Sequence, residues 1–302
     1  AKVGRKLYPR LLRTVARRGS KVQMLCSEDR FLPGFDEDAR TGKGKRLSVR
    51  VLAPIPEADQ NGRRRLRWLG DVGKTKNGHS VVLRLQYEGV SMLLGGDLNI
   101  PAEEYLLETH TGMPLPPRGD AQQRTAFIDR ARETFQVDVA KACHHGSGDF
   151  TSLYLEAVNP IVTIISSGDD EPHCHPRPDA LGAFGKFGRG DRPLIFSTEL
   201  ARSAKENIKS PSTLRTEDRR LLEERDAAVG EKREQLGAKI DALLDKLERS
   251  VAVYGMINVR TDGECVIIAQ KLETPRDDTK WDLHRLEPGP DGLRYVSKHE
   301  AH

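Results

Sequence analysis

Short strand-forming runs alternate with helix-forming segments over residues 80–200, and this alternation constrains the fold more than any other feature of the chain. Strands are predicted at 80–87 and 90–95, joined by a Glu88-Gly89 turn, and helices are predicted to follow. Further strands are predicted at DVAKAC, PIVTIISSG and PLIFSTE, again separated by helical segments. Strands that alternate with helices are typical of a layered α/β fold.

The pattern divides the 302 residues into three parts. We expect a core over 1–207, a charged helical insertion over 208–249, and C-terminal β-hairpins over 250–302 that complete or cap the core. The insertion is nearly all charge, Ala and Leu, and we predict a long helix or helical hairpin that covers a neighbouring surface. Apolar residues recur in it at sevenfold spacing, at Leu222, Val229, Leu236 and Leu243. It is open whether this insertion has no chemical role or contacts a protein partner.

Composition narrows the class of protein. Hydrophobic residues make up 37% of the chain and charged residues 31%, which fits a soluble globular protein and argues against wholesale disorder. No apolar run reaches the roughly 18 residues that a membrane span needs, so we expect none. The four cysteines are widely spread and form no CxxC pair, which favours a reducing, cytoplasmic setting. They are Cys26, Cys143, Cys174 and Cys265.

Positive charge is concentrated at the start of the chain. Residues 1–27 hold eight basic side chains and no acidic one, although the whole chain carries a formal charge of only +4. Such a patch can attract the phosphates of nucleic acid, and it can equally be the solvated face of a helix predicted over 5–18. Residues 57–78 are also polar and basic, with Trp68 as their expected large apolar anchor.

Histidines cluster in two short loops that follow predicted strands. His144 and His145 come directly after DVAKAC, and His173 and His175 come shortly after PIVTIISSG. Asp97 ends the strand at 90–95. Ligands usually bind where the carboxyl ends of strands gather on one edge of an α/β sheet, so we expect these loops to converge there.

Imidazole nitrogen and carboxylate oxygen are suitable ligands for zinc or manganese. A carboxylate can bridge two cations, and a pair of cations about 3.5–4 Å apart can polarise a phosphoryl oxygen and activate a bridging water. Ser147 is placed to donate a hydrogen bond to a bound anion. Asp97 has a competing interpretation as the N-cap of the next helix, and the two roles can coexist. The remaining histidines, at 110, 284, 299 and 302, are interpreted as surface positions, and His79 as a turn residue.

Four segments taken together resemble the later part of the metallo-β-lactamase-fold domain of ComEC-type competence proteins. They are NGHSVVLRLQYEGVSMLLGGDL, DVAKACHHGS, LEAVNPIVTIISSG and HCHP. The most specific piece is Lys141-x-x-His144-His145-Gly146-Ser147. The resemblance implies an α/β fold of the αββα sandwich type.

The same resemblance implies roles for individual residues. Asp97, His144, His145 and His175 would be metal ligands or would line the metal site, and Lys141 would contact a phosphate. The family's first metal motif, H-x-H-x-D-H or a close variant, has no counterpart, because no histidine precedes His79. The chain begins with Ala, so we expect an N-terminally truncated piece of a longer hydrolase, or else a chain that has lost half of its ligands. A truncated sandwich is expected to leave apolar sheet surface exposed and to bind metal weakly.

Three functional hypotheses follow. In the first, the intact protein is a metal-dependent hydrolase of phosphoester bonds in nucleic acid or nucleotides, with zinc or manganese as cofactor and with Asp97, His144, Lys141 and Ser147 in catalytic roles. In the second, the chain is a non-catalytic binding module that uses the basic helix and the 210–249 segment as contact surfaces. In the third, it binds nucleic acid without hydrolysis through Arg10, Arg13, Arg17 and Arg18.

Overall fold

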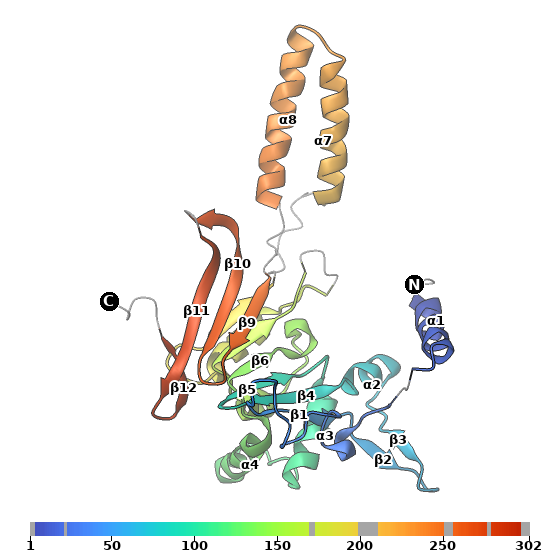
Figure 1. The fold of residues 1–302 in the computed structure, drawn as a ribbon, viewed down its shortest axis with the longest axis vertical. Coiled ribbons are helices and arrows are strands. Elements are labelled where there is room, and N and C mark those ends of the chain that lie inside the picture. The colour runs from blue at the N-terminus through green and yellow to red at the C-terminus, as the bar shows by residue number, and fades with distance from the viewer. Residues whose placement is uncertain are drawn as a thin grey trace.

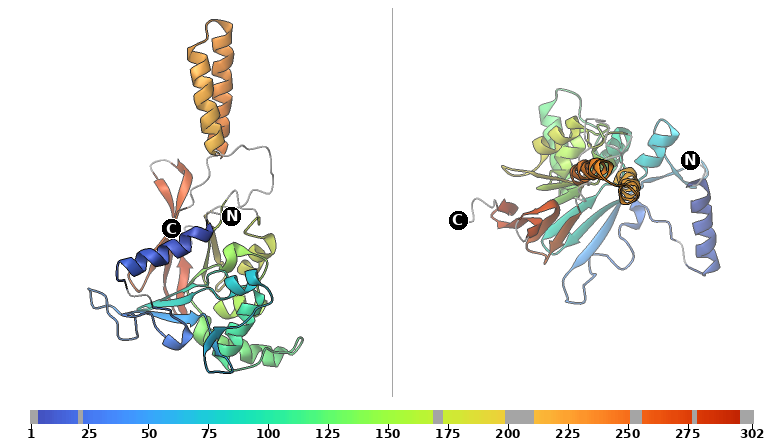
Figure 2. Two further views of the ribbon diagram at one scale, coloured as in Figure 1. Left: turned by 90° about the vertical axis from the view of Figure 1, so that its right-hand side faces the viewer. Right: turned by 90° about the horizontal axis from the view of Figure 1, so that it is seen from above.

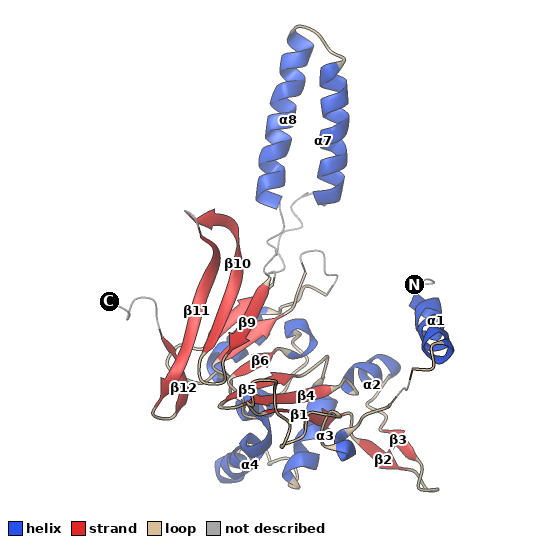
Figure 3. Cartoon of the chain, viewed as in Figure 1, coloured by secondary structure: helices blue, strands red, loops and turns tan. Residues whose placement is uncertain are grey.

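The computed structural model describes residues 4–20, 23–168, 173–198, 211–250, 256–276 and 279–296 (Figures 1 and 3). The helices are α1 (Gly4–Arg17), α2 (Val72–Gly78), α3 (Ile100–Thr111), α4 (Ala121–Phe135), α5 (Ser152–Val158), α6 (Pro178–Phe187), α7 (Pro211–Asp226) and α8 (Glu231–Ser250), with 3-10 turns η1 (Ser27–Asp29) and η2 (Cys143–Gly146). The strands are β1 (Leu47–Ala53), β2 (Pro56–Ala58), β3 (Arg64–Leu66), β4 (Val82–Tyr87), β5 (Val90–Leu94), β6 (Val139–Lys141), β7 (Val162–Ile165), β8 (Leu194–Ser197), β9 (Ile257–Thr261), β10 (Val266–Arg276), β11 (Thr279–Gly289) and β12 (Gly292–Val296).

A six-stranded mixed sheet forms the centre, in the order β1-β4-β5-β6-β7-β8. The β1-β4 and β4-β5 pairs are antiparallel, and the pairs from β5 to β8 are parallel. The tight connection between β4 and β5 turns at Glu88, whose φ is 48°. These elements confirm the predicted α/β class, with the parallel strands presenting their carboxyl ends along one edge.

Helices cover one face of this sheet. Side chains alternate across each strand, so Leu93 of β5 and Ala140 of β6 point toward α3, α4 and α5. Helix α6 packs on the same face farther along, where Ala180 and Phe184 meet Ile165 of β7. The largest fully buried side chains of this helical layer are Leu106, Leu107, Phe127, Phe135 and Tyr154.

The opposite face of the central sheet is covered by a second, antiparallel sheet in the order β12-β11-β10-β9 (Figures 1 and 2). Val139 and Val162 point away from the helices and are fully buried against Val266, Ile268 and Leu286 of the second sheet. The expectation of an exposed apolar sheet face is therefore wrong for these residues. The C-terminal strands supply the covering layer, and the described layers run helices, central sheet, second sheet.

Helices α7 and α8 form an antiparallel hairpin with a small core of its own, made by Leu221, Ala228, Leu236, Ile240 and Leu243. The hairpin projects from the rest of the fold in Figure 1 and in the left view of Figure 2, so the prediction that it covers a neighbouring surface is wrong for its described residues. Val229 is 85% exposed because it lies in the connection between the two helices. The sevenfold spacing therefore does not mark a continuous buried seam.

The basic segment before β4 also departs from expectation. Trp68 is 62% exposed, and Leu69 is the buried side chain that joins the helical core. The indole Nε1 of Trp68 donates a hydrogen bond to the Gly70 carbonyl (2.9 Å). Within the described ranges, no helix combines the length and the apolar character needed to cross a membrane.

The two-sheet interface predicts a sharp contrast between neighbouring positions of β10. Ile268 is fully buried between the sheets, whereas Ile267 points outward and is 43% exposed. Ile268→Ala is expected to lower the free energy of unfolding by about 2–5 kcal/mol, because it leaves a cavity in a packed core. Urea denaturation of Ile268→Ala and of the matched Ile267→Ala control measures this, and equal losses in the two variants would show that the second sheet is not packed as described.

Candidate functional site

Three loops meet at the carboxyl edge of the parallel strands. The backbone N–H of His144, after β6, donates to the carbonyl of Gly96, after β5 (3.0 Å). The backbone N–H of Arg177 donates to the carbonyl of Gly146 (2.8 Å), which joins the segment before α6 to the same place. The expected convergence of the Asp97, His144–His145 and His175 loops is therefore seen in the backbone itself.

Two glycines allow this close approach. Gly96 has a φ of +62°, and a Cβ there would lie 2.4 Å from the Cβ of Ser80. Gly146 has a φ of +78°, and a Cβ there would lie 2.7 Å from the Cβ of Pro176. His144 and His145 also adopt positive φ values, 47° and 55°, which are uncommon for residues with a side chain and recur at functional sites.

Asp97 and His145 face each other. Asp97 Oδ1 lies 3.5 Å from His145 Nε2, and both side chains remain open to solvent, with exposed fractions of 37% and 44%. The other ring nitrogen, Nδ1, lies 2.6 Å from the backbone carbonyl oxygen of Ser166. A carbonyl only accepts hydrogen bonds, so Nδ1 carries the proton and Nε2 is directed at the carboxylate.

His144 and His175 form a second pair beside the first. Their ring centroids are 5.5 Å apart in an edge-to-face arrangement, and His173 stacks on His175 at 5.8 Å. His175 is buried and His173 is exposed. His144 Nε2 lies 3.5 Å from the Asn77 side-chain amide, and its buried Nδ1 has no hydrogen-bond partner among the described residues.

Lys141 and Ser147 lie in the same loops but make local contacts. Lys141 Nζ donates to the Gly96 carbonyl (3.3 Å). Ser147 Oγ accepts from the backbone N–H of Asp149 (3.2 Å), which leaves its hydroxyl proton free to donate elsewhere. Both side chains therefore hold the loops in place, whatever else they contact.

The N-cap alternative for Asp97 is wrong. Asn99 caps α3 by accepting from the backbone N–H of Ala102 (3.3 Å). The Asp97 carboxylate is thus not used at the helix end, and its backbone N–H is held by Ser80 Oγ (2.9 Å). The carboxylate is left facing His145.

One pair of donor atoms, Asp97 Oδ1 and His145 Nε2, has the spacing of two ligands of one metal ion. Two ligands of a tetrahedral zinc ion are about 3.4 Å apart, given Zn–N and Zn–O distances of about 2.0–2.2 Å, and the Asp97–His145 separation of 3.5 Å matches. No group of three or more His, Cys, Asp or Glu side chains spaced for a metal occurs in the described part of the chain, which omits residues 169–172 just before His173. Burial raises the pKa of the neighbouring Cys143 thiol to about 12, so without a bound metal this thiol is protonated at neutral pH.

Sequence reasoning missed the residues that position the two pairs. Asn77 and Ser80 come from α2 and the turn that follows it, and Ser166 from the end of β7. Asn77 and Ser80 are the first and last residues of the Asn-Gly-His-Ser stretch, which by its sequence predicts only a turn. Nothing in the sequence marks the Ser166 carbonyl as a partner of His145.

Three other histidines have structural contacts. His79 Nε2 lies 2.7 Å from the Arg67 carbonyl oxygen. His110 and His284 are wrongly predicted as surface positions: His110 packs edge-on against Phe135, and His284 packs on Phe196 of the central sheet with ring centroids 5.0 Å apart. The predictions for 299 and 302 fall outside the described residues.

Comparison of the chain with protein-family models, with curated proteins and with solved structures found no match.

A buried carboxyl group supports the loop beside the site. Glu103 of α3 is fully buried, and its Oε2 accepts from the backbone N–H of Thr151 (2.6 Å), the N-cap of α5. Its Oε1 is buried with no partner among the described residues. Burial raises the pKa of Glu103 to about 8, so the group is largely protonated at neutral pH.

Stability is expected to depend on pH through Glu103. Because the folded pKa of about 8 exceeds the unfolded value near 4.5, this group's contribution is complete below pH 4.5 and is lost as pH rises to about 8. Glu103→Gln removes this dependence. The free energy of unfolding of each protein is measured by urea denaturation. The value for Glu103→Gln minus that for the wild type should rise by about 1.4 kcal/mol per pH unit across that window.

Glu104→Gln, at the next position of α3, controls for the loss of a helical carboxyl group. A parallel pH dependence of Glu103→Gln and wild type between pH 5 and 8 would contradict the assignment of a protonated Glu103.

Proposed function

We propose that this chain supplies the Asp97/His145 and His144/His175 groups of a metal-dependent hydrolase that acts on phosphoester bonds in nucleic acid or nucleotides. Zinc is the first candidate for the metal and manganese the second, since carboxylate and imidazole donors suit both. We further propose a metallo-β-lactamase-type sandwich. The described layers supply helices, sheet and sheet of the αββα order.

The geometry of the Asp97–His145 pair carries the proposal. With Nδ1 donating to Ser166, a neutral His145 presents the lone pair of Nε2 to a carboxylate oxygen, and two acceptors repel each other. A cation bound between them would remove this repulsion and would be held from both sides. A histidine held by a backbone carbonyl through its second nitrogen is the usual arrangement of metal-ligating imidazoles.

The other residues have distinct tasks in this proposal. His144 and His175 complete or flank the metal site from the second pair, and Lys141 and Ser147 neutralise or hydrogen-bond a phosphate oxygen. The bound metal would polarise the phosphoryl group and lower the pKa of a water molecule. The phosphoester class of the bond rests on the family resemblance and on exposed basic side chains such as Arg10, Arg13 and Arg17 of α1.

Metal binding and hydrolysis test the proposal together. Asp97→Ala and His145→Ala should each weaken Zn²⁺ affinity at least tenfold in competition with a chromogenic chelator, because each removes one of two facing ligands. With added Zn²⁺ or Mn²⁺, Asp97→Ala should abolish hydrolysis of bis(p-nitrophenyl) phosphate while circular dichroism shows an unchanged fold.

Asp129→Ala is the matched control, since Asp129 is an exposed aspartate on α4 with a side chain that is 66% exposed. Unchanged zinc affinity in both site variants would show that the pair does not hold the metal. Histidine ¹⁵N shifts report on this directly, because the Nε2 resonance of His145 changes when a metal binds to it.

A second candidate is a non-catalytic interaction module, and the α7–α8 hairpin favours it. The hairpin has its own core and projects from the fold after the carboxyl end of β8, the edge that carries the candidate site. Metal analysis discriminates between the two functions. Less than roughly a tenth of an equivalent of bound metal after dialysis, with no rise in melting temperature on adding metal, would support the interaction module.

A further inference from the structure

A cavity lies at the amino ends of the parallel strands, at the opposite end of the central sheet from the candidate site. It has a volume of about 410 Å³ and is formed where the loop between α6 and β8 meets strand β12. Ile161, just before the amino end of β7, contributes to its wall. The candidate site lies at the carboxyl ends of the same parallel strands, so the two places are separated by the length of the sheet.

One arginine of this cavity is fixed in position. Arg189 Nη2 donates to Asp138 Oδ1 (2.6 Å), and Asp138 Oδ2 in turn accepts from the backbone N–H and the hydroxyl of Ser91 (2.8 and 2.7 Å). The Nε of Arg189 is buried and out of reach of a ligand, but 28% of the side chain is exposed. A guanidinium held in this way keeps donors available at little further entropic cost on binding.

Two more arginines line the cavity from separate parts of the chain. Arg192 comes from the α6–β8 loop and Arg294 from β12, and both are exposed. Neither forms an ion pair within the described part of the chain. Asp138 compensates the charge of Arg189, and Asp191 is the one acidic side chain in the lining, so Arg192 and Arg294 leave a net positive charge there. Arginine forks match the paired oxygens of phosphate groups.

The remaining wall is apolar. Ile161 and Leu293 contribute aliphatic surface, and Tyr295 contributes a ring whose hydroxyl is tied to His284 Nδ1 (3.2 Å). The cavity is larger than inorganic phosphate needs and lies in the size range of small-molecule sites, about 300–1,000 Å³. A molecule that filled it would need both a charged and an uncharged part.

We propose that this cavity binds a small phosphate-bearing organic anion of the nucleotide class, with Arg189, Arg192 and Arg294 on the phosphates and Tyr295 against the organic body. The site is separate from the Asp97–His145 pair and does not depend on the proposed hydrolase activity.

Calorimetric titration of the full chain tests the proposal, with ADP, pyrophosphate and adenosine as probes in buffer containing EDTA. ADP is expected to bind with a Kd below about 1 mM and to weaken as KCl rises from 50 to 300 mM, whereas adenosine should not bind. Weaker binding of pyrophosphate than of ADP would support the nucleotide class. Pyrophosphate binding as tightly as ADP would overturn it, because the organic body would then contribute nothing to recognition.

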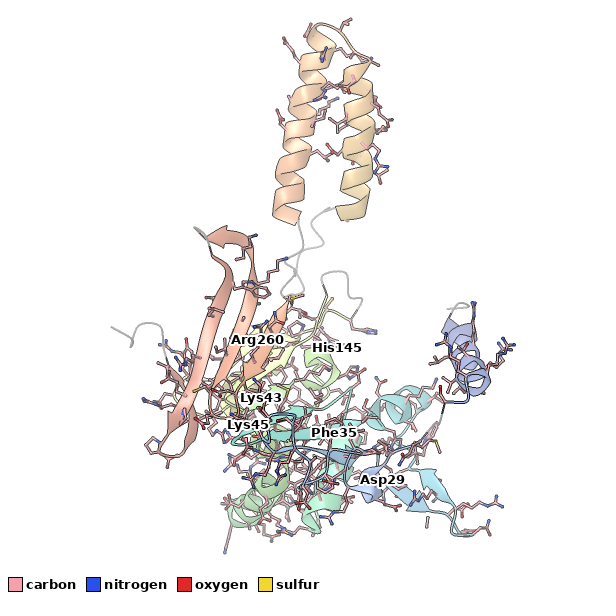
Figure 4. The ribbon with its side chains drawn as sticks, in the orientation of Figure 1. Asp29, Phe35, Lys43, Lys45, His145 and Arg260 are labelled. Atoms are coloured by element: carbon pink, nitrogen blue, oxygen red, sulfur yellow. The ribbon has the colours of Figure 1, made fainter. Side chains whose placement is uncertain are left out.

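Arg192→Gln and Arg294→Gln are each expected to raise the Kd for ADP at least tenfold. Arg260→Gln is the matched control, because Arg260 is an exposed arginine on β9 (Figure 4). Strands β9 and β12 are the two opposite edges of the second sheet, so Arg260 is on the edge strand that does not line the cavity. This control variant should leave the Kd within twofold.

Three further outcomes would overturn the proposal: no ADP binding, binding of adenosine equal to that of ADP, or unchanged affinity in both arginine variants. Loss of ADP binding in Asp97→Ala would also overturn it, by assigning the ligand to the other site. Because EDTA removes free metal, failure here is distinguishable from failure of the hydrolase proposal.

Discussion

The parallel hydrogen-bonded ladder through β5, β6 and β7 is the interaction on which the rest of the structure depends. It aligns Leu94 with Lys141 and Lys141 with Ile164, so the three strands end together. Asp97 and His144 each follow their ladder residue by three positions, and Ser166 follows Ile164 by two. One register therefore brings a carboxylate, an imidazole pair and the carbonyl that orients His145 to one edge. A shift of one residue would reverse which side chains face each layer.

Such a ladder persists only when both faces of the sheet are covered. Parallel sheets are normally buried on both sides, and here the two sides are covered by different means. Helices α3 to α6 cover one face, while β9 to β12, which follow the helical hairpin in sequence, return to cover the other. The inward residues of β10, Val266 and Ile268, are fully buried, although the chain between β8 and β9 first passes through a separate helical pair.

Charge is arranged differently at the two ends of this sheet. At the carboxyl edge the Asp97 carboxylate faces the Nε2 of His145, and the Nδ1 of the same ring is held by the Ser166 carbonyl. Beyond the amino edge, arginines from two distant segments line one cavity with a single aspartate. Asp138 lies just before β6 and anchors Arg189, so the strand that carries the histidines at one end helps to order the arginines at the other.

The alternation of strands and helices determined the α/β class and most element positions, because local hydrophobic period and turn residues act over a few neighbours. It also marked Asp97, His144, His145 and His175, since each follows a strand or a tight turn. It did not determine that Leu69 rather than Trp68 is buried, nor that Val229 is exposed, since burial depends on which other segments pack against a side chain. Only the tertiary structure decided that Asn99 caps α3, that Ser166 orients His145, that Glu103 is buried and protonated, and that β9 to β12 cover the central sheet. Most of these are contacts between segments far apart in the chain. The helix cap is a choice between two nearby residues, Asp97 and Asn99, that both suit an N-cap, so local propensity cannot rank them.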